Sequence, residues 1–82
     1  EAYPNPADQS FNLMFPNVEE GELVEVMAFN ANGQLLRQFS LTALKGQPQE
    51  IDVAGLPDGM YFILAESNGT PLIRQKVMIS HK

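Results

Sequence analysis

Few side chains in this sequence are of the types that perform covalent or acid–base chemistry. The 82 residues include one histidine, His81, and no cysteine. Any Ser/His/Asp or Cys/His constellation would depend on a residue at the end of the chain, where fraying is expected. The missing thiols also exclude disulfides and thiolate metal sites. We therefore expect no enzymatic activity, no cofactor and no metal, with His81 acting neither as a base nor as a ligand.

The carboxylates are weaker candidates for a site. Glu19, Glu20 and Glu22 fall within one turn, where like charges normally stay in water. Asp52 and Asp58 flank a loop and supply the oxygen ligands that calcium prefers, but the regular acidic spacing of a calcium loop is missing. We expect both aspartates to stabilise turns.

A short motif, Asn68-Gly69-Thr70, matches the acceptor for N-glycosylation. Asn-Gly is also a strong turn signal and Pro71 follows it, so we expect a structural turn here. The glycines are spread over separate turns and form no phosphate-binding loop. Three of them are expected to adopt positive φ, namely Gly33, Gly59 and Gly69.

The balance of charge excludes several partners. Ten acidic and five basic residues give a net charge of −5, which disfavours binding to nucleic acid or to an anionic membrane. No apolar run approaches the ~20 residues that span a bilayer, so we expect no membrane insertion. The sequence begins with Glu1 and shows no signal-peptide pattern. We expect it to be part of a longer polypeptide or a processed chain.

The elements that hold these residues are short strands. Apolar residues alternate with polar ones between clusters of Gly, Pro and Asn, and no stretch has the period of a helix. The pattern predicts an all-β fold, an immunoglobulin-like antiparallel β-sandwich of about six to seven short strands. We expect a single domain over 1–82, with an extended lead-in at 1–10 and the sandwich at 11–79. Strands are expected at 11–15, 23–29, 34–41, 50–53, 60–66 and 72–79.

The strand at 23–29 is apolar on both faces. Val24, Val26 and Ala28 form one face, and Leu23, Met27 and Phe29 lie on the other. This pattern predicts a central strand with little water on either side. The phenylalanines are expected in the core. The core is predicted to include Val24, Val26, Phe39, Ile51, Val53, Ile63, Val77 and Ile79.

The order of these signals is similar to that of a known family. The sequence opens with Tyr3-Pro4-Asn5-Pro6-Ala7, and Val24 to Gly33 read Val-x-Val-x-x-Phe-Asn-x-x-Gly. Ile51-Asp52-Val53-x-x-Leu56-x-x-Gly59-x-Tyr61 follows, then Gly69 and finally Lys76-Val77-Met78-Ile79. From Tyr3 to Ile79 the chain resembles the C-terminal sorting domain of the type IX secretion system of Bacteroidetes, in its type A form.

This resemblance implies a non-catalytic secretion signal. It implies an upstream cargo domain in the same chain and recognition by the type IX outer-membrane translocon. In most members a surface sortase-like signal peptidase removes the domain, while some members keep it. The cargo would pass through the periplasm to the cell surface or the medium. The sorting motif that it implies consists of Tyr3, Pro4, Asn5, Pro6, Gly33, Leu56, Gly59, Tyr61, Gly69, Lys76, Val77, Met78 and Ile79.

Two alternatives share the same strand pattern. One is a spacer or adhesion domain of the immunoglobulin or fibronectin kind. The other is a carbohydrate-binding module, which is disfavoured because such modules typically present exposed Trp and Tyr, and this chain has no Trp.

Overall fold

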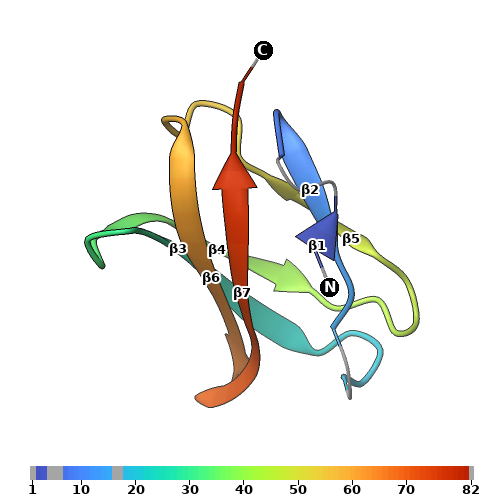
Figure 1. The fold of residues 1–82 in the computed structure, drawn as a ribbon. Helices are drawn as coiled ribbons and strands as arrows, with labels where there is room; N and C mark the ends of the chain where they lie inside the picture. Colours follow the sequence, from blue (N-terminus) through green and yellow to red (C-terminus); the bar gives the residue numbers. More distant parts are fainter. Residues whose placement is uncertain (1, 4–6, 16–17, 82) are drawn as a thin grey trace.

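The computed structural model describes residues 2–3, 7–15 and 18–81, which form two packed β-sheets and no helix (Figure 1). These residues therefore contain no helix that is long and apolar enough to cross a membrane. The larger sheet has the order β4-β3-β6-β7 and the smaller one β1-β2-β5, with every neighbouring pair antiparallel. The strands are β1 (Ala2–Tyr3), β2 (Ser10–Leu13), β3 (Leu23–Asn30), β4 (Leu35–Thr42), β5 (Gln49–Asp52), β6 (Gly59–Ser67) and β7 (Thr70–Ile79). The predicted all-β antiparallel sandwich is confirmed.

The core lies between the inward faces of the two sheets. Inward residues alternate with outward ones along each strand, as the pleat requires. Seven of the eight predicted core residues are at most 1% exposed, and the eighth, Phe39, is only partly buried because it lies on the edge strand β4. The smaller sheet contributes Phe11, Leu13 and Ile51 to this core.

The expectation that β3 has little water on either side is wrong for one of its faces. Val24, Val26 and Ala28 are buried, but Leu23 is 63% exposed and Phe29 is only partly buried. The fold has two layers, so nothing covers the outer face of the larger sheet in the described part of the chain. Phe62 lies on this outer face and is 47% exposed, which also corrects its expected core position.

The turns follow the glycine predictions. Gly33, Gly59 and Gly69 have φ values of 82°, 149° and 78°. Asn68 also has a positive φ, 52°, and a two-residue hairpin with positive φ at both positions is the type I′ turn that Asn-Gly favours. The loop of the β3–β4 hairpin, residues 31–34, is longer, and there only Gly33 has positive φ. The Asn30 side chain accepts hydrogen bonds from the N–H groups of Asn32 and Gln34 in this loop.

The segment before β2 takes part in the sandwich. β1 pairs with β2, and Ala7, which is fully buried, forms a parallel bridge with β7. The Ala7 N–H donates to the Met78 carbonyl at 2.8 Å, and the Ser80 N–H donates to the Ala7 carbonyl at 2.8 Å. Two residues later, the Gln9 carbonyl accepts a hydrogen bond from the Val53 N–H at 2.9 Å. Residues 7–9 thus link the two sheets along one side.

Two polar side chains link elements across the interior. Arg37 points inward from β4, and its guanidinium donates to the carbonyls of Asp52 and Ala54 at 3.0 and 2.9 Å. Gln49 is buried and satisfies the backbone where the chain leaves β4. Its amide donates to the Thr42 carbonyl at 2.9 Å and accepts from the Leu44 N–H at 3.1 Å. The Gln49 contacts satisfy backbone groups next to a buried side chain, whereas the Arg37 contact to the Asp52 carbonyl is exposed.

Candidate functional site: the terminal clasp and the outer face of the last strand

The predicted motif residues of β6 and β7 gather at one end of the sandwich. Cross-strand pairing places Gly59 opposite Ile79, and Tyr61 opposite Val77. Val77 and Ile79 are fully buried, and Tyr61 is 2% exposed. These inward residues are part of the core.

The turn before β6 explains why the motif has Leu, Gly and Tyr at these spacings. Leu56 is buried, and its N–H donates to the Val53 carbonyl at 3.1 Å. The Tyr61 hydroxyl donates to the Pro57 carbonyl at 2.7 Å, which fastens the turn to the strand that follows it. Burial raises the pKa of Tyr61, and the nearby Asp58 carboxylate raises it further. The phenol is therefore a neutral donor at physiological pH.

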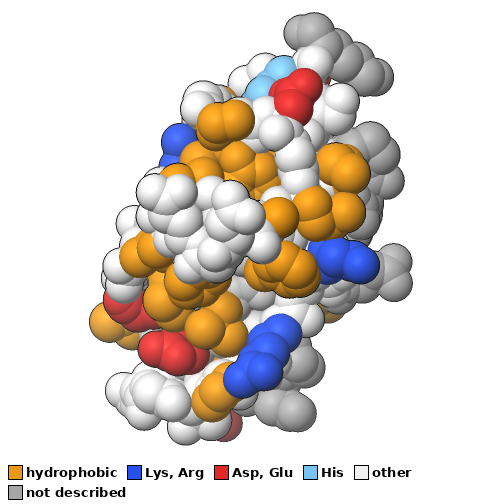
Figure 2. All heavy atoms as spheres, turned by 60° about the vertical axis from the view of Figure 1, so that its left-hand side comes forward, with side chains coloured by type: hydrophobic (Ala, Val, Ile, Leu, Met, Phe, Trp, Pro, Cys, Tyr) orange, Lys and Arg blue, Asp and Glu red, His pale blue; other side chains and the backbone are white. Residues whose placement is uncertain are grey.

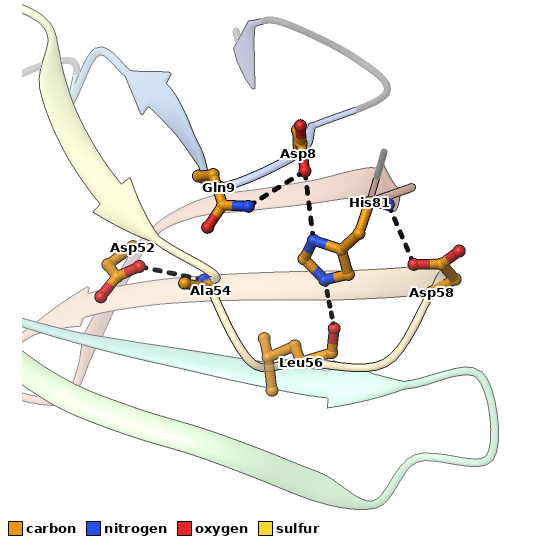
Figure 3. Close-up of polar contacts among 7 residues, drawn as sticks. All are labelled: Asp8, Gln9, Asp52, Ala54, Leu56, Asp58 and His81. Atoms are coloured by element: carbon orange, nitrogen blue, oxygen red, sulfur yellow. Dashed lines mark hydrogen bonds and ion pairs between the residues drawn. The ribbon is translucent and has the colours of Figure 1, made fainter.

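Next to this turn, residues from three distant segments form what we call the terminal clasp, consisting of Asp8, Leu56, Asp58 and His81 (Figure 3). The His81 N–H donates to Asp58 Oδ1 at 3.0 Å. The imidazole lies between two acceptors, with Nε2 on the Leu56 carbonyl and Nδ1 3.3 Å from Asp8 Oδ1. The expectation that His81 frays is therefore wrong, because residues distant in sequence hold it in place through hydrogen bonds.

The environment of His81 favours its protonated form. The Leu56 carbonyl raises the pKa of His81 most strongly, and Asp8 and Asp58 raise it as well, while partial burial opposes them. Each ring nitrogen faces an oxygen that can only accept, so both hydrogen bonds form together only when both nitrogens carry a proton. The side chains of His81 and Asp8 are 27% and 38% exposed, so water reaches the pair.

The contacts of the terminal clasp hold His81 against the segment before β2 and the turn before β6. Among the described residues there is no group of three or more His, Cys, Asp or Glu side chains that could hold a metal ion. Asp52 has the turn role that was expected of it, since it accepts from the Ala54 N–H at 3.0 Å. Asp58 instead accepts from the N–H of His81, which is far from it in sequence. The two serines with described side-chain bonds, Ser10 and Ser67, donate to Glu50 and to the Leu23 carbonyl, away from His81.

The other part of the predicted motif faces outward. Lys76 and Met78 alternate with the buried Val77 and Ile79, so they lie on the outer face of β7 together with Arg74. Hydrophobic side chains gather along this face of the larger sheet, with Lys and Arg side chains beside them (Figure 2). A groove of about 450 Å³ lies there and is lined mainly by Phe29, Phe62, Leu64, Arg74, Gln75 and Lys76.

The remaining motif residues are not part of one site. Gly33 lies in the β3–β4 turn and Gly69 in the β6–β7 turn at the opposite end of the larger sheet. Tyr3 pairs with Asn12 in the smaller sheet, and Pro4, Asn5 and Pro6 lie outside the described residues. Most of the described motif residues therefore occupy turns or core positions of the fold.

Sequence reasoning missed two features of this region. Asp8 and His81 are 73 positions apart, and the Ala7–β7 bridge brings their segments together. Phe62 was assigned to the core because it lies in a strand, although its position opposite Phe29 places it on the outer face. The available signal was the alternation of β6, in which Tyr61 and Ile63 occupy the other face.

Comparison with known proteins identifies a family and a relative that match most of the chain. The family described as "Secretion system C-terminal sorting domain" matches residues 1–80. The chain is also similar to Beta-agarase A of Zobellia galactanivorans, with 34% identity over 73 residues that make up 89% of this chain. The matched region is 13% of the agarase, so the chain spans only about an eighth of that relative.

Proposed function

The chain belongs to the family of type IX secretion C-terminal sorting domains, and we propose that it directs a cargo protein in the same polypeptide through the outer-membrane translocon of that system. The observation that carries the proposal is the family match over residues 1–80, nearly the full chain. In this proposal the cargo crosses the periplasm and ends at the cell surface or in the medium. A surface sortase-like signal peptidase then separates the domain from the cargo.

The size of the shared region supports a modular role. The similar segment is a small fraction of the agarase, so most of that protein lies outside the part that it shares with this chain. A domain that serves as a secretion signal has to fold by itself and tolerate different cargo domains in the same chain. The buried core, the turns and the terminal clasp provide such a fold without help from a cargo.

The division of the motif between inward and outward residues suggests how it is recognised. Leu56, Tyr61, Val77 and Ile79 are buried and maintain the shape of the domain. Lys76 and Met78 are exposed on the outer face of β7. We place direct recognition on these outward residues and assign the buried ones to stability.

A fusion experiment tests the proposal. The 82 residues are joined to the C-terminus of a reporter that carries an inner-membrane export signal, in a bacterium with a type IX system. We expect the reporter at the cell surface or in the medium, whereas the reporter alone stays in the periplasm. Deletion of Lys76 to Lys82 should retain the fusion in the periplasm. A folded fusion that stays periplasmic would contradict the proposal and favour a spacer domain.

A further inference from the structure

The last strand, β7, forms one edge of the larger sheet and is only partly covered. In an antiparallel sheet, successive residues of an edge strand direct their N–H and C=O groups alternately toward the neighbouring strand and away from it. Met78 and Ser80 bond to Ala7, so the even-numbered residues of β7 direct these groups away from β6. By the same alternation, Arg74 and Lys76 present their backbone groups on the open edge.

Little in the described part of the chain occupies this stretch of edge. The Gln75 side chain donates to the Lys76 carbonyl at 3.2 Å, and that exposed bond is easily exchanged. No described residue bonds to the N–H or the C=O of Arg74, or to the N–H of Lys76, from the open side. An edge of this kind is a template for an added strand.

The side chains along the edge define what kind of strand fits. In the outer face, Phe29, Phe62 and Lys76 form one row across three strands, and Met27, Leu64 and Arg74 form the next. Within the described residues neither Arg74 nor Lys76 makes an ion pair or a side-chain hydrogen bond. A strand added beside β7 would place its outward residues directly next to these two cations, in a molecule whose net charge is −5.

The inner face of the edge is also incomplete. Val77 and Ile79 are fully buried, but Leu72, Ile73 and Gln75 remain partly exposed. The smaller sheet has only three strands and does not extend over this end of β7 (Figure 1). Apolar residues on an added strand would cover Ile73 and extend the core.

Together these features point to one occupant. We propose that the edge of β7 from Leu72 to Lys76 binds an extended segment of a partner protein as a fifth strand, with acidic side chains beside Arg74 and Lys76 and apolar side chains facing inward. A second copy of this chain does not fit, because pairing β7 with itself brings these cations together. The inference rests on the proposed function in one respect: the partner would belong to the secretion machinery.

A direct binding test uses a short synthetic peptide in which valine and glutamate alternate, titrated into the isotopically labelled chain and followed by NMR. We expect the largest shifts, and slowed amide exchange, at Arg74 and Lys76. A peptide with lysine in place of glutamate should bind far more weakly. Arg74→Gln and Lys76→Gln should each weaken binding by about 1.5- to 5-fold, the range for a cross-strand charge pair. Lys45→Gln, which removes an exposed loop charge, is the matched control and should change nothing.

A proline variant distinguishes the contribution of the Lys76 backbone N–H to peptide binding from that of the Lys76 charge. Lys76→Pro removes an N–H that faces the open edge and leaves the ladder to β6 intact. It should bind the peptide at least about fivefold more weakly than Lys76→Gln, the effect of one lost hydrogen bond. Unchanged binding by Lys76→Pro, shifts that map to another face, or binding of Arg74 and Lys76 to phosphatidylserine vesicles without binding of the peptide would overturn the inference.

The same variants separate this inference from the proposed function. If the double variant Arg74→Gln/Lys76→Gln loses peptide binding and its reporter fusion is no longer exported, the inference is supported. If it loses peptide binding and is still exported, the edge is not the recognition site, although the sorting function stands. If the unaltered domain binds the peptide but exports no reporter, the sorting function fails and strand addition at β7 stands.

Discussion

Substitution of Tyr61 tests how the motif residues stabilise the fold. Tyr61 is 2% exposed, and its hydroxyl donates to the Pro57 carbonyl at 2.7 Å. Tyr61→Phe keeps the ring and removes only this bond. Pro57 is exposed, so water can reach its carbonyl, and the cost should be about 0.5–1.5 kcal/mol. Tyr61→Ala also removes the buried ring, which costs about 3–5 kcal/mol for a core aromatic.

These costs are large for a domain of this size. At about 0.05–0.15 kcal/mol per residue, 82 residues have an unfolding free energy of about 4–12 kcal/mol. Tyr61→Ala should therefore leave the domain marginal or unfolded, whereas Tyr61→Phe should leave it folded. Urea unfolding followed by far-UV circular dichroism measures both values. A Tyr61→Ala variant that loses less than about 1 kcal/mol would show that the ring is not a core residue and would refute this account of the motif.

Three further results are expected. Gln49→Leu leaves the Thr42 carbonyl and the Leu44 N–H without a side-chain partner and should cost about 2 kcal/mol or more in urea unfolding, and a neutral result would show that water replaces the amide. Gly69→Val forces a β-branched residue to φ 78° and should cost about 1–2 kcal/mol, with Gly69→Asn costing less; equal stabilities would contradict the turn assignment. The raised pKa of His81 means that its contribution to stability is full below the ordinary value of about 6.5 and is lost as the pH rises through the higher folded value. The urea midpoint of the wild type should therefore fall toward that of His81→Gln as the pH rises above about 6.5, and a constant difference would count against the clasp.

The strands and turns could be predicted because their signals are local. Alternation along β3 and β6 identifies which residues share a face, and the glycines at 33, 59 and 69 mark turns whose φ values are positive. The same pattern placed Val24, Val26, Val77 and Ile79 in the core. Local sequence also predicted the turn contact of Asp52.

The features that could not be predicted depend on how segments far apart in the sequence pack against one another. Alternation does not say whether a second apolar face is covered, so Phe62 was expected inside and lies outside on a two-layer fold. His81 was expected to fray because its partners, Asp8 and Leu56, come from segments far from it in sequence. Arg37 shares a face with Phe39 and Leu41, and only the opposing carbonyls of Asp52 and Ala54 explain a guanidinium there.

The most direct test of the sorting function is the location of one reporter fusion in two matched strains. The 82 residues follow an export-competent reporter, and the strains differ only in whether the type IX outer-membrane translocon is present. Cell fractionation with a protease-protection assay measures the share of reporter outside the outer membrane. The proposal predicts an external reporter in the first strain and a folded, protected periplasmic reporter in the second. Equal distributions in the two strains would contradict it.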